Sequence, residues 1–198
     1  GAPAVRTPGF ISSADGQQWS SWQPLAAIEE GHYQVSEITG ERAATALNYH
    51  PDGRGVNYRT NLYYLESTDA GSTWQNAPGE PLNVPLEAVN NPALVHDYEA
   101  EGLKVYVKDL RFDAEGRPVI LHITSRGFEP GPENGPRTWR TARWTGSEWE
   151  IRPITSSDSS YDTGSLYIEK DGAWRLVGPT EPGPQPDRKS TRLNSSHR

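Results

Sequence analysis

Histidine, tyrosine and arginine side chains are the groups of this chain best suited to chemistry, since the chain has no cysteine to act as a thiol nucleophile. Imidazole and phenol groups exchange protons with a substrate, and a guanidinium binds oxyanions through several donors at once. The candidate proton-transfer residues are His32, His50, His96 and Tyr98, and the candidate anion-binding residues are Arg59, Arg126 and Arg137. Whether they form a site depends on the elements that place them.

The hydrophobic pattern predicts β-strands throughout. Apolar and polar residues alternate over short runs, and turn residues separate the runs. The predicted strands cover residues 32–38, 42–50, 58–66, 104–110, 118–126, 138–144, 149–154, 163–168 and 174–177. Equivalent turns fall at Gly40, Gly116 and Gly172, so the order of strands and turns repeats along the chain. His122 lies in the middle of a strand and is expected to be packed or to line the channel of the propeller.

The stretch Ser67-Thr68-Asp69-Ala70-Gly71-Ser72-Thr73-Trp74 resembles the Asp box of sialidase-like β-propellers. Asp69 and Gly71 suit a tight turn, and we expect Asp69 to staple a hairpin and not to act in catalysis. Residues 15–19 resemble the same motif with one position deleted. They precede an expected outer strand at 19–25, and residues 77–101 are expected to hold another outer strand and a long loop. The chain is therefore predicted to be all-β, part of a propeller of four-stranded antiparallel blades, with two full blades and two partial ones.

The connectivity of such blades predicts which loops share a face. The glycine turns and the Asp box fall on one face. The opposite face carries the loops 26–32, 50–59, 90–104, 126–138 and 155–164, and function tends to reside in long loops. These loops, or the strand ends beside them, hold all seven candidate residues, so the sequence predicts a site on that face.

Composition narrows the classes of partner. The C-terminal segment 187–198 resembles a translated sequencing adapter and is interpreted as an artefact, which leaves 1–186 as the propeller fragment. That segment carries four Lys or Arg residues and one aspartate, so omitting it takes the net charge from −7 to −10. An acidic body argues against nucleic acid or an anionic membrane as partner. No run approaches the length of a membrane span, and the N-terminal residues show no signal-peptide pattern.

From about residue 32 to 182 the chain resembles the BNR-4 group of sialidase-fold propellers. The resemblance rests on the Asp box and on Leu47-Asn48-Tyr49-His50-Pro51, Arg59-Thr60-Asn61-Leu62-Tyr63-Tyr64, Asp97-Tyr98-Glu99, Val105-Tyr106-Val107-Lys108-Asp109 and residues 125–132. Characterised relatives include polysaccharide lyases of the ulvan lyase kind and hydrolytic sialidases. In the lyases His and Tyr transfer protons while Arg neutralises the uronate. The resemblance thus implies His50 or His32 as base, Tyr98 as base or acid, Arg126 or Arg59 as neutraliser, and His96 and Arg137 as further substrate contacts.

Three functions stay open on this basis. The first is a lyase that cleaves a uronate-containing glycan by β-elimination. The second is a sialidase-like hydrolase, for which Tyr161 and Asp162 could serve although no arginine triad is evident, and the third is a glycan-binding propeller without catalysis. The expected partner is an acidic polysaccharide or oligosaccharide, and the full-length protein is expected to be a secreted or periplasmic monomer. No cofactor is required; loop-face His and Asp residues could hold a zinc or calcium ion, but no spacing is diagnostic.

Overall fold

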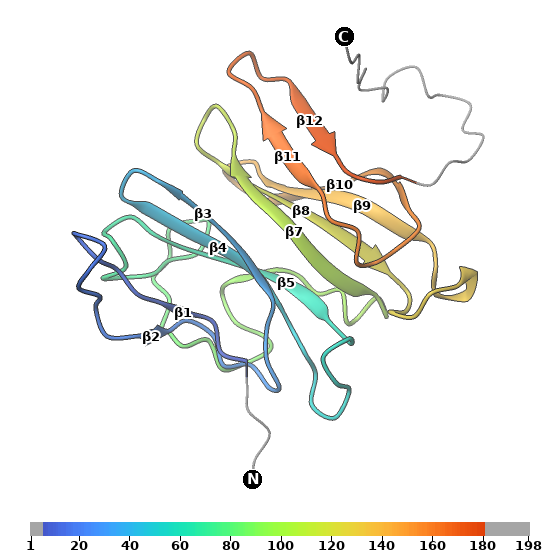
Figure 1. Cartoon of the computed structure of the whole chain (residues 1–198), viewed down its shortest axis with the longest axis horizontal. Coiled ribbons are helices and arrows are strands. Elements are labelled where there is room, and N and C mark those ends of the chain that lie inside the picture. The colour runs from blue at the N-terminus through green and yellow to red at the C-terminus, as the bar shows by residue number, and fades with distance from the viewer. Residues whose placement is uncertain (1–5, 181–198) are drawn as a thin grey trace.

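A computed structural model describes residues 6–180, which form four antiparallel β-sheets arranged as successive blades (Figure 1). The fold is an all-β propeller, as predicted. Blade 1 pairs β1 (Gly9–Phe10) with β2 (Gln23–Pro24), and blade 4 pairs β11 (Ser165–Ile168) with β12 (Trp174–Val177). Blade 2 comprises β3 (Gln34–Thr39), β4 (Arg42–Tyr49), β5 (Thr60–Ser67) and β6 (Leu94–His96). Blade 3 comprises β7 (Lys104–Phe112), β8 (Pro118–Ser125), β9 (Arg137–Trp144) and β10 (Trp149–Ser157).

The predicted strands are confirmed with small shifts at their ends. The outer strand expected within 77–101 is the short β6, and the one expected at 19–25 is only β2. A 3-10 turn, η1 (Pro132–Asn134), interrupts the loop between β8 and β9. The proposed artefactual segment lies outside the described residues. No helix among residues 6–180 has the length and apolar character that crossing a membrane requires.

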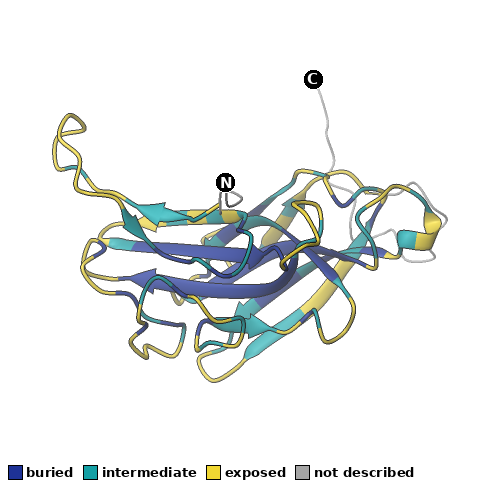
Figure 2. Cartoon of the chain, turned by 90° about the horizontal axis from the view of Figure 1, so that it is seen from below, coloured by how far each residue is buried: buried dark blue, intermediate teal, exposed yellow. Residues whose placement is uncertain are grey.

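Three hydrophobic clusters hold neighbouring blades together. Strands β4, β5 and β8 are buried on both faces, as the dark strands in Figure 2 show, because a blade lies against each side of them. Alternation along β8 sends Ile120 toward blade 2, whereas Val119 and Leu121 pack toward blade 4 with Trp139 and Leu166. Burying each such side chain contributes about 1.5–3 kcal/mol, so contact between blades is the main source of stability.

The Asp box forms the staple that its sequence predicts. Ser67 Oγ donates to Asp69 Oδ1 at 2.8 Å, and Asp69 accepts from the backbone N–H of Thr73 at 2.9 Å and from its hydroxyl at 2.7 Å. These bonds from Thr73 and Ser67 lower the pKa of Asp69 to about 2. Asp15 makes the matching bonds to the N–H groups of Gln17 and Gln18, both at 2.8 Å. Asp69 thus acts within its own hairpin.

The blades have a turn face and a loop face. The turn face carries the turns at 40–41, 68–73, 113–117, 145–148 and 169–173. The loop face carries the loops 50–59, 97–103, 126–136 and 158–164. Neighbouring blades touch at both faces, since Arg42 Nη1 donates to the carbonyl of Gly116 on the turn face and Thr60 Oγ1 donates to that of Leu103 on the loop face.

Asp113 is the most heavily bonded carboxylate of the turn face. It pairs with Arg117 at 3.0 Å and with Arg143 at 2.8 Å, and it is only 7% exposed. Asp113→Ala should destabilise the protein by about 2–4 kcal/mol, because two part-buried guanidinium groups lose their partner. Urea unfolding measures this loss. Glu115→Gln is the control, since Glu115 meets the same arginines from an exposed position and its loss should cost under about 1 kcal/mol. Equal effects of the two changes would contradict the expectation.

Candidate functional site

His50 follows β4 directly and is fixed on the loop face by the segment that enters blade 2. Its N–H donates to the carbonyl of Gly31 at 2.8 Å, and its own carbonyl accepts from the N–H of Glu30 at 3.1 Å. Asn48, two residues earlier, accepts from the N–H of Tyr33 at 3.1 Å and donates to the carbonyl of Val105 at 2.8 Å. One buried asparagine therefore sets the position of Tyr33 relative to blade 3.

The imidazole of His50 is buried and unpartnered. Its exposed fraction is 0%, and neither Nδ1 nor Nε2 has a hydrogen-bond partner within residues 6–180. Burial, and then the positive charges of Arg59, His32 and Arg6, lower the pKa of His50 to about 4. Buried polar groups are almost always satisfied, so His50 is exceptional. At neutral pH it is an uncharged base with a free lone pair.

Arg59 lies among three tyrosine rings beside this histidine. Its Cζ is 3.8 Å from the ring centroid of Tyr33, 5.2 Å from that of Tyr106 and 5.4 Å from that of Tyr161. Its Nε donates to the carbonyl of Val56 at 3.1 Å, and within residues 6–180 neither terminal nitrogen donates a hydrogen bond. The ring of Tyr33 also covers His50, with ring centroids 5.0 Å apart and planes tilted by 31°.

Blades 3 and 4 complete the arrangement. Tyr106, on β7, donates its hydroxyl to the carbonyl of Asn57 at 3.3 Å and so anchors the loop that carries Arg59. Tyr161, in the loop before β11, packs edge-on against Tyr106 at 5.5 Å and is 45% exposed. Lys108 follows Tyr106 by two positions and donates to the carbonyl of Ser160 at 3.0 Å. We call the six residues Tyr33, His50, Arg59, Tyr106, Lys108 and Tyr161 the aromatic–cation cluster.

His32 lies beside the cluster, but its ring nitrogens are hydrogen-bonded to backbone groups. Its Nε2 accepts from the N–H of Ile28 at 3.2 Å, so Nδ1 carries the proton and donates to the carbonyl of Arg6 at 3.0 Å. Burial lowers the pKa of His32. Because both ring nitrogens are engaged, His32 has no free lone pair with which to accept a proton from a substrate. Of the two histidines, the geometry favours His50 as base.

Tyr98 and His96 form a separate group with His122, which is packed as predicted. The Tyr98 hydroxyl lies 2.8 Å from His122 Nε2, and both side chains are buried between blades 2 and 3. His96 packs on Tyr98 with ring centroids 4.3 Å apart and contacts Glu101 at 2.5 Å. Within residues 6–180 no hydrogen bond or ring contact joins this group to His50 or Arg59. Its geometry supports a packing role.

His122 should make stability fall in acid. Burial lowers the pKa of His122 to about 3, against about 6.5 in an unfolded chain. Above pH 6.5 neither state is protonated and stability is complete. Between pH 6.5 and 3 only the unfolded state gains the proton, so stability falls by a few kcal/mol. Urea unfolding at pH 7 and pH 4.5 measures this loss, and His122→Asn should make it smaller. An unchanged loss in that variant would count against the interpretation.

The two remaining arginines differ in their surroundings. Arg126 is exposed, and its side chain makes no hydrogen bond or ion pair with the described residues. Arg137 is 7% exposed; it donates to the carbonyls of Gly131 and Glu129 at 3.2 and 2.5 Å and to Ser160 Oγ at 3.3 Å. Arg137 therefore ties together two loops of the loop face, and its donors are occupied by protein groups.

Tyr33, Tyr106 and Lys108 are the cluster members that the sequence analysis did not select, and Tyr161 entered it only through the hydrolase alternative. A signal was present, because Tyr106 and Lys108 are two apart on a predicted strand, a spacing that favours a shared face, although a register shift between Val107 and Asp109 interrupts the regular alternation there. Tyr33 stands one residue before β3, near the same end of its blade. Seeing them as a group requires knowing that these strand ends surround Arg59.

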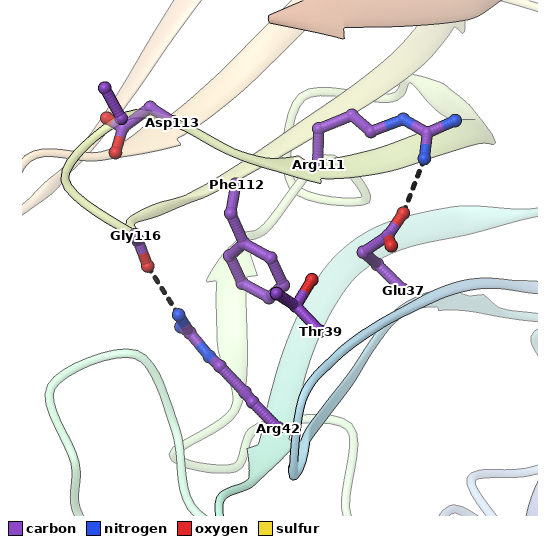
Figure 3. Close-up of a pocket in the computed structure, with 8 residues that line it drawn as sticks. Glu37, Thr39, Arg42, Arg111, Phe112, Asp113 and Gly116 are labelled. Atoms are coloured by element: carbon purple, nitrogen blue, oxygen red, sulfur yellow. Dashed lines mark hydrogen bonds and ion pairs between the residues drawn. The ribbon is translucent and has the colours of Figure 1, made fainter. Parts of the chain in front are cut away.

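A cavity on the turn face differs in character from this cluster. It measures about 410 Å³ and is lined by Glu37, Thr39, Arg42, Arg111, Phe112, Asp113, Ala114 and Gly116. Figure 3 shows Arg111 directed at Glu37, to which it donates at 2.5 Å, and Arg42 directed at Gly116. Each of its charged groups already has a partner in the protein, since Arg111 pairs with Glu37 across the cavity, while Arg42 and Asp113 pair with residues outside the lining. Among residues 6–180 no group of three His, Asp or Glu side chains is placed to hold a metal ion.

Comparisons with known proteins agree with the fold. A PL25 ulvan lyase from Pseudoalteromonas sp. (strain PLSV) is 24% identical over 135 residues, which cover 63% of this chain and 27% of that protein. A solved structure of a PL25 ulvan lyase matches with a TM-score of 0.65 and 20% identity, covering 80% of this chain and 40% of that one. A second, bound to -[GlcA(1-4)Rha3S]-, matches with a TM-score of 0.67 and 19% identity, covering 86% and 43%.

The chain covers between 27% and 43% of the length of these relatives. The family model of BNR repeat-containing proteins matches residues 13–157, from the shortened Asp box to the end of β10. That range includes His50, Arg59, Tyr106 and Lys108. The chain therefore belongs to the BNR repeat-containing family.

Proposed function

We propose that the protein is a polysaccharide lyase that cleaves a uronate-containing glycan by β-elimination. The observation that carries the proposal is the pairing of an uncharged, unpartnered His50 with the open guanidinium of Arg59. The similarity to PL25 ulvan lyase, one structure of which holds -[GlcA(1-4)Rha3S]-, supports glucuronate as the sugar attacked. A polysaccharide substrate further implies action outside the cytoplasm.

The reaction needs three groups. Arg59 neutralises the uronate carboxylate, which makes the proton on C5 acidic, and His50 accepts that proton. The bond from C4 to the leaving oxygen breaks, a double bond forms between C4 and C5, and an acid protonates the leaving oxygen. Tyr33 is the proposed acid once its ring has turned aside from His50, because Arg6 donates a hydrogen bond to its hydroxyl oxygen and the hydroxyl proton has no acceptor within residues 6–180.

Tyr33 must also move. Its ring covers His50, which is 0% exposed, so the substrate reaches the imidazole only when this side chain turns aside. That complete burial favours a second candidate function, glycan binding without turnover, in which His50 stays covered and the tyrosine rings form the binding surface.

Product analysis on the intact protein tests the proposal. Incubation with a glucuronate-containing polysaccharide should release an unsaturated uronate that absorbs in the near ultraviolet, and Tyr33→Phe should slow its release. Binding of the polysaccharide without any unsaturated product would establish the glycan-binding function. Saturated products would instead indicate a hydrolase, and either result would overturn the lyase proposal.

A further inference from the structure

Lys108 and Arg59 are two cations that approach the same aromatic ring. Lys108 Nζ lies 5.8 Å and Arg59 Cζ lies 5.2 Å from the ring centroid of Tyr106. Neither side chain takes part in an ion pair among residues 6–180. Part-buried charges are normally paired. Two like charges beside one ring that form no ion pair within the described residues mark a place where an anion would be stabilised.

The surroundings of Lys108 keep its amine available. The side chain is half-buried, and among residues 6–180 its amine donates one hydrogen bond, to the carbonyl of Ser160, which leaves two N–H donors. Burial, and then the charge of Arg59, lower the pKa of Lys108 to about 8, although Asp162 acts in the opposite direction. The charged and titratable groups that face Lys108 are Arg59, Asp162 and Tyr106.

We propose that Lys108 and Arg59 together bind one oxyanion of an acidic sugar, with Tyr161 as the adjacent wall for the sugar ring. This inference rests on the proposed function and adds Lys108 to Arg59 as a second cation that binds the substrate. A carboxylate or a sulfate ester has the charge and the acceptor oxygens that the pair requires. Tyr161 is half-exposed, and its hydroxyl-bearing ring offers the apolar face on which sugars commonly pack.

The role of Lys108 predicts a particular pH dependence of binding. Below pH 8 the amine is charged and the affinity is complete. As the pH rises through about 8 the amine loses its proton. Binding of the anion should therefore weaken by up to about tenfold between pH 7 and pH 9, because roughly a tenth of the amines are still charged at pH 9. Lys108→Met should show the weaker binding at every pH. Lys108→Arg keeps its charge and should bind equally well at pH 7 and pH 9.

Calorimetric titration of the intact protein with glucuronate and, separately, with rhamnose 3-sulfate tests this site at pH 7 and pH 9. If only the affinity for glucuronate falls at alkaline pH, Lys108 and Arg59 bind the carboxylate. If only the affinity for the sulfated sugar falls, they bind the sulfate. The inference would be overturned if the affinity for both sugars were unchanged by pH and by Lys108→Met. It would also be overturned if neither sugar bound. A pH-dependent affinity without any lyase product would retain the site and reject the proposed reaction.

Discussion

Replacing Arg59 with alanine is expected to lower kcat/KM for a uronate polysaccharide by about 10²–10³-fold, the effect of removing one group that stabilises developing charge. The expectation rests on the position of the guanidinium among Tyr33, Tyr106 and Tyr161, with its terminal nitrogens free of acceptors in the part of the chain that the structure describes. Arg59→Lys should recover only part of the activity. It keeps the charge but loses the planar fork that binds a carboxylate through two bonds.

Arg126→Ala is the matched control for that experiment. The sequence favours Arg126 as neutraliser, with Arg59 as the alternative and as a substrate contact. In the structure the side chain of Arg126 is exposed and makes no contact with the aromatic–cation cluster. Its loss should change kcat/KM by less than about threefold, as expected of surface substitutions. Initial rates of near-ultraviolet absorbance measure both variants. A larger loss in Arg126→Ala than in Arg59→Ala would move the neutralising role to Arg126.

Arg59 and His50 should also be coupled through their charges. The positive charge of Arg59 is the second cause, after burial, of the low pKa of His50. Removing that charge should raise the pKa of His50 toward its ordinary value. The acid limb of the pH profile, where activity falls as His50 becomes protonated, should therefore lie at a higher pH in Arg59→Ala than in the wild-type protein.

Replacing His50 with glutamine is expected to lower kcat by about 10²–10⁴-fold, the usual contribution of a general base, with little change in KM. The pH profile of the wild-type protein gives a second measure. His50 accepts a proton only in its neutral form, and its pKa is about 4. Activity should therefore rise as the pH increases through about 4 and be complete at neutral pH, whereas an ordinary histidine would place this limb near 6.5.

His32→Gln separates catalysis from structure at the neighbouring histidine. Both ring nitrogens of His32 are used by the backbone groups of Ile28 and Arg6. Its loss should cost about 1–3 kcal/mol of stability, while the kcat of the folded fraction is retained. Chemical unfolding and rate measurements on the same samples distinguish the two effects. Retained kcat in His50→Gln with a lost kcat in His32→Gln would reverse the assignment.

Much of the architecture could be predicted from the sequence because its signals are local. Alternation of apolar residues located the strands of blades 2 and 3, and glycines at 40, 116 and 172 located equivalent turns. Asp69 forms the expected staple through neighbours within four residues. Once that hairpin is placed on one face, chain connectivity places His50 and Arg59 on the other.

The membership of the candidate site was decided only in three dimensions. A histidine, tyrosine or arginine on the loop face can serve a substrate or a backbone carbonyl, and the sequence does not distinguish these cases. Tyr98 is hydrogen-bonded to His122, and Arg137 donates hydrogen bonds to the carbonyls of an irregular loop. These partners are distant in sequence or belong to backbone that has no sequence signature. His50 alone among the buried polar side chains within residues 6–180 has ring nitrogens without a hydrogen-bond partner, and the tertiary structure places it where the charge of Arg59 acts on it.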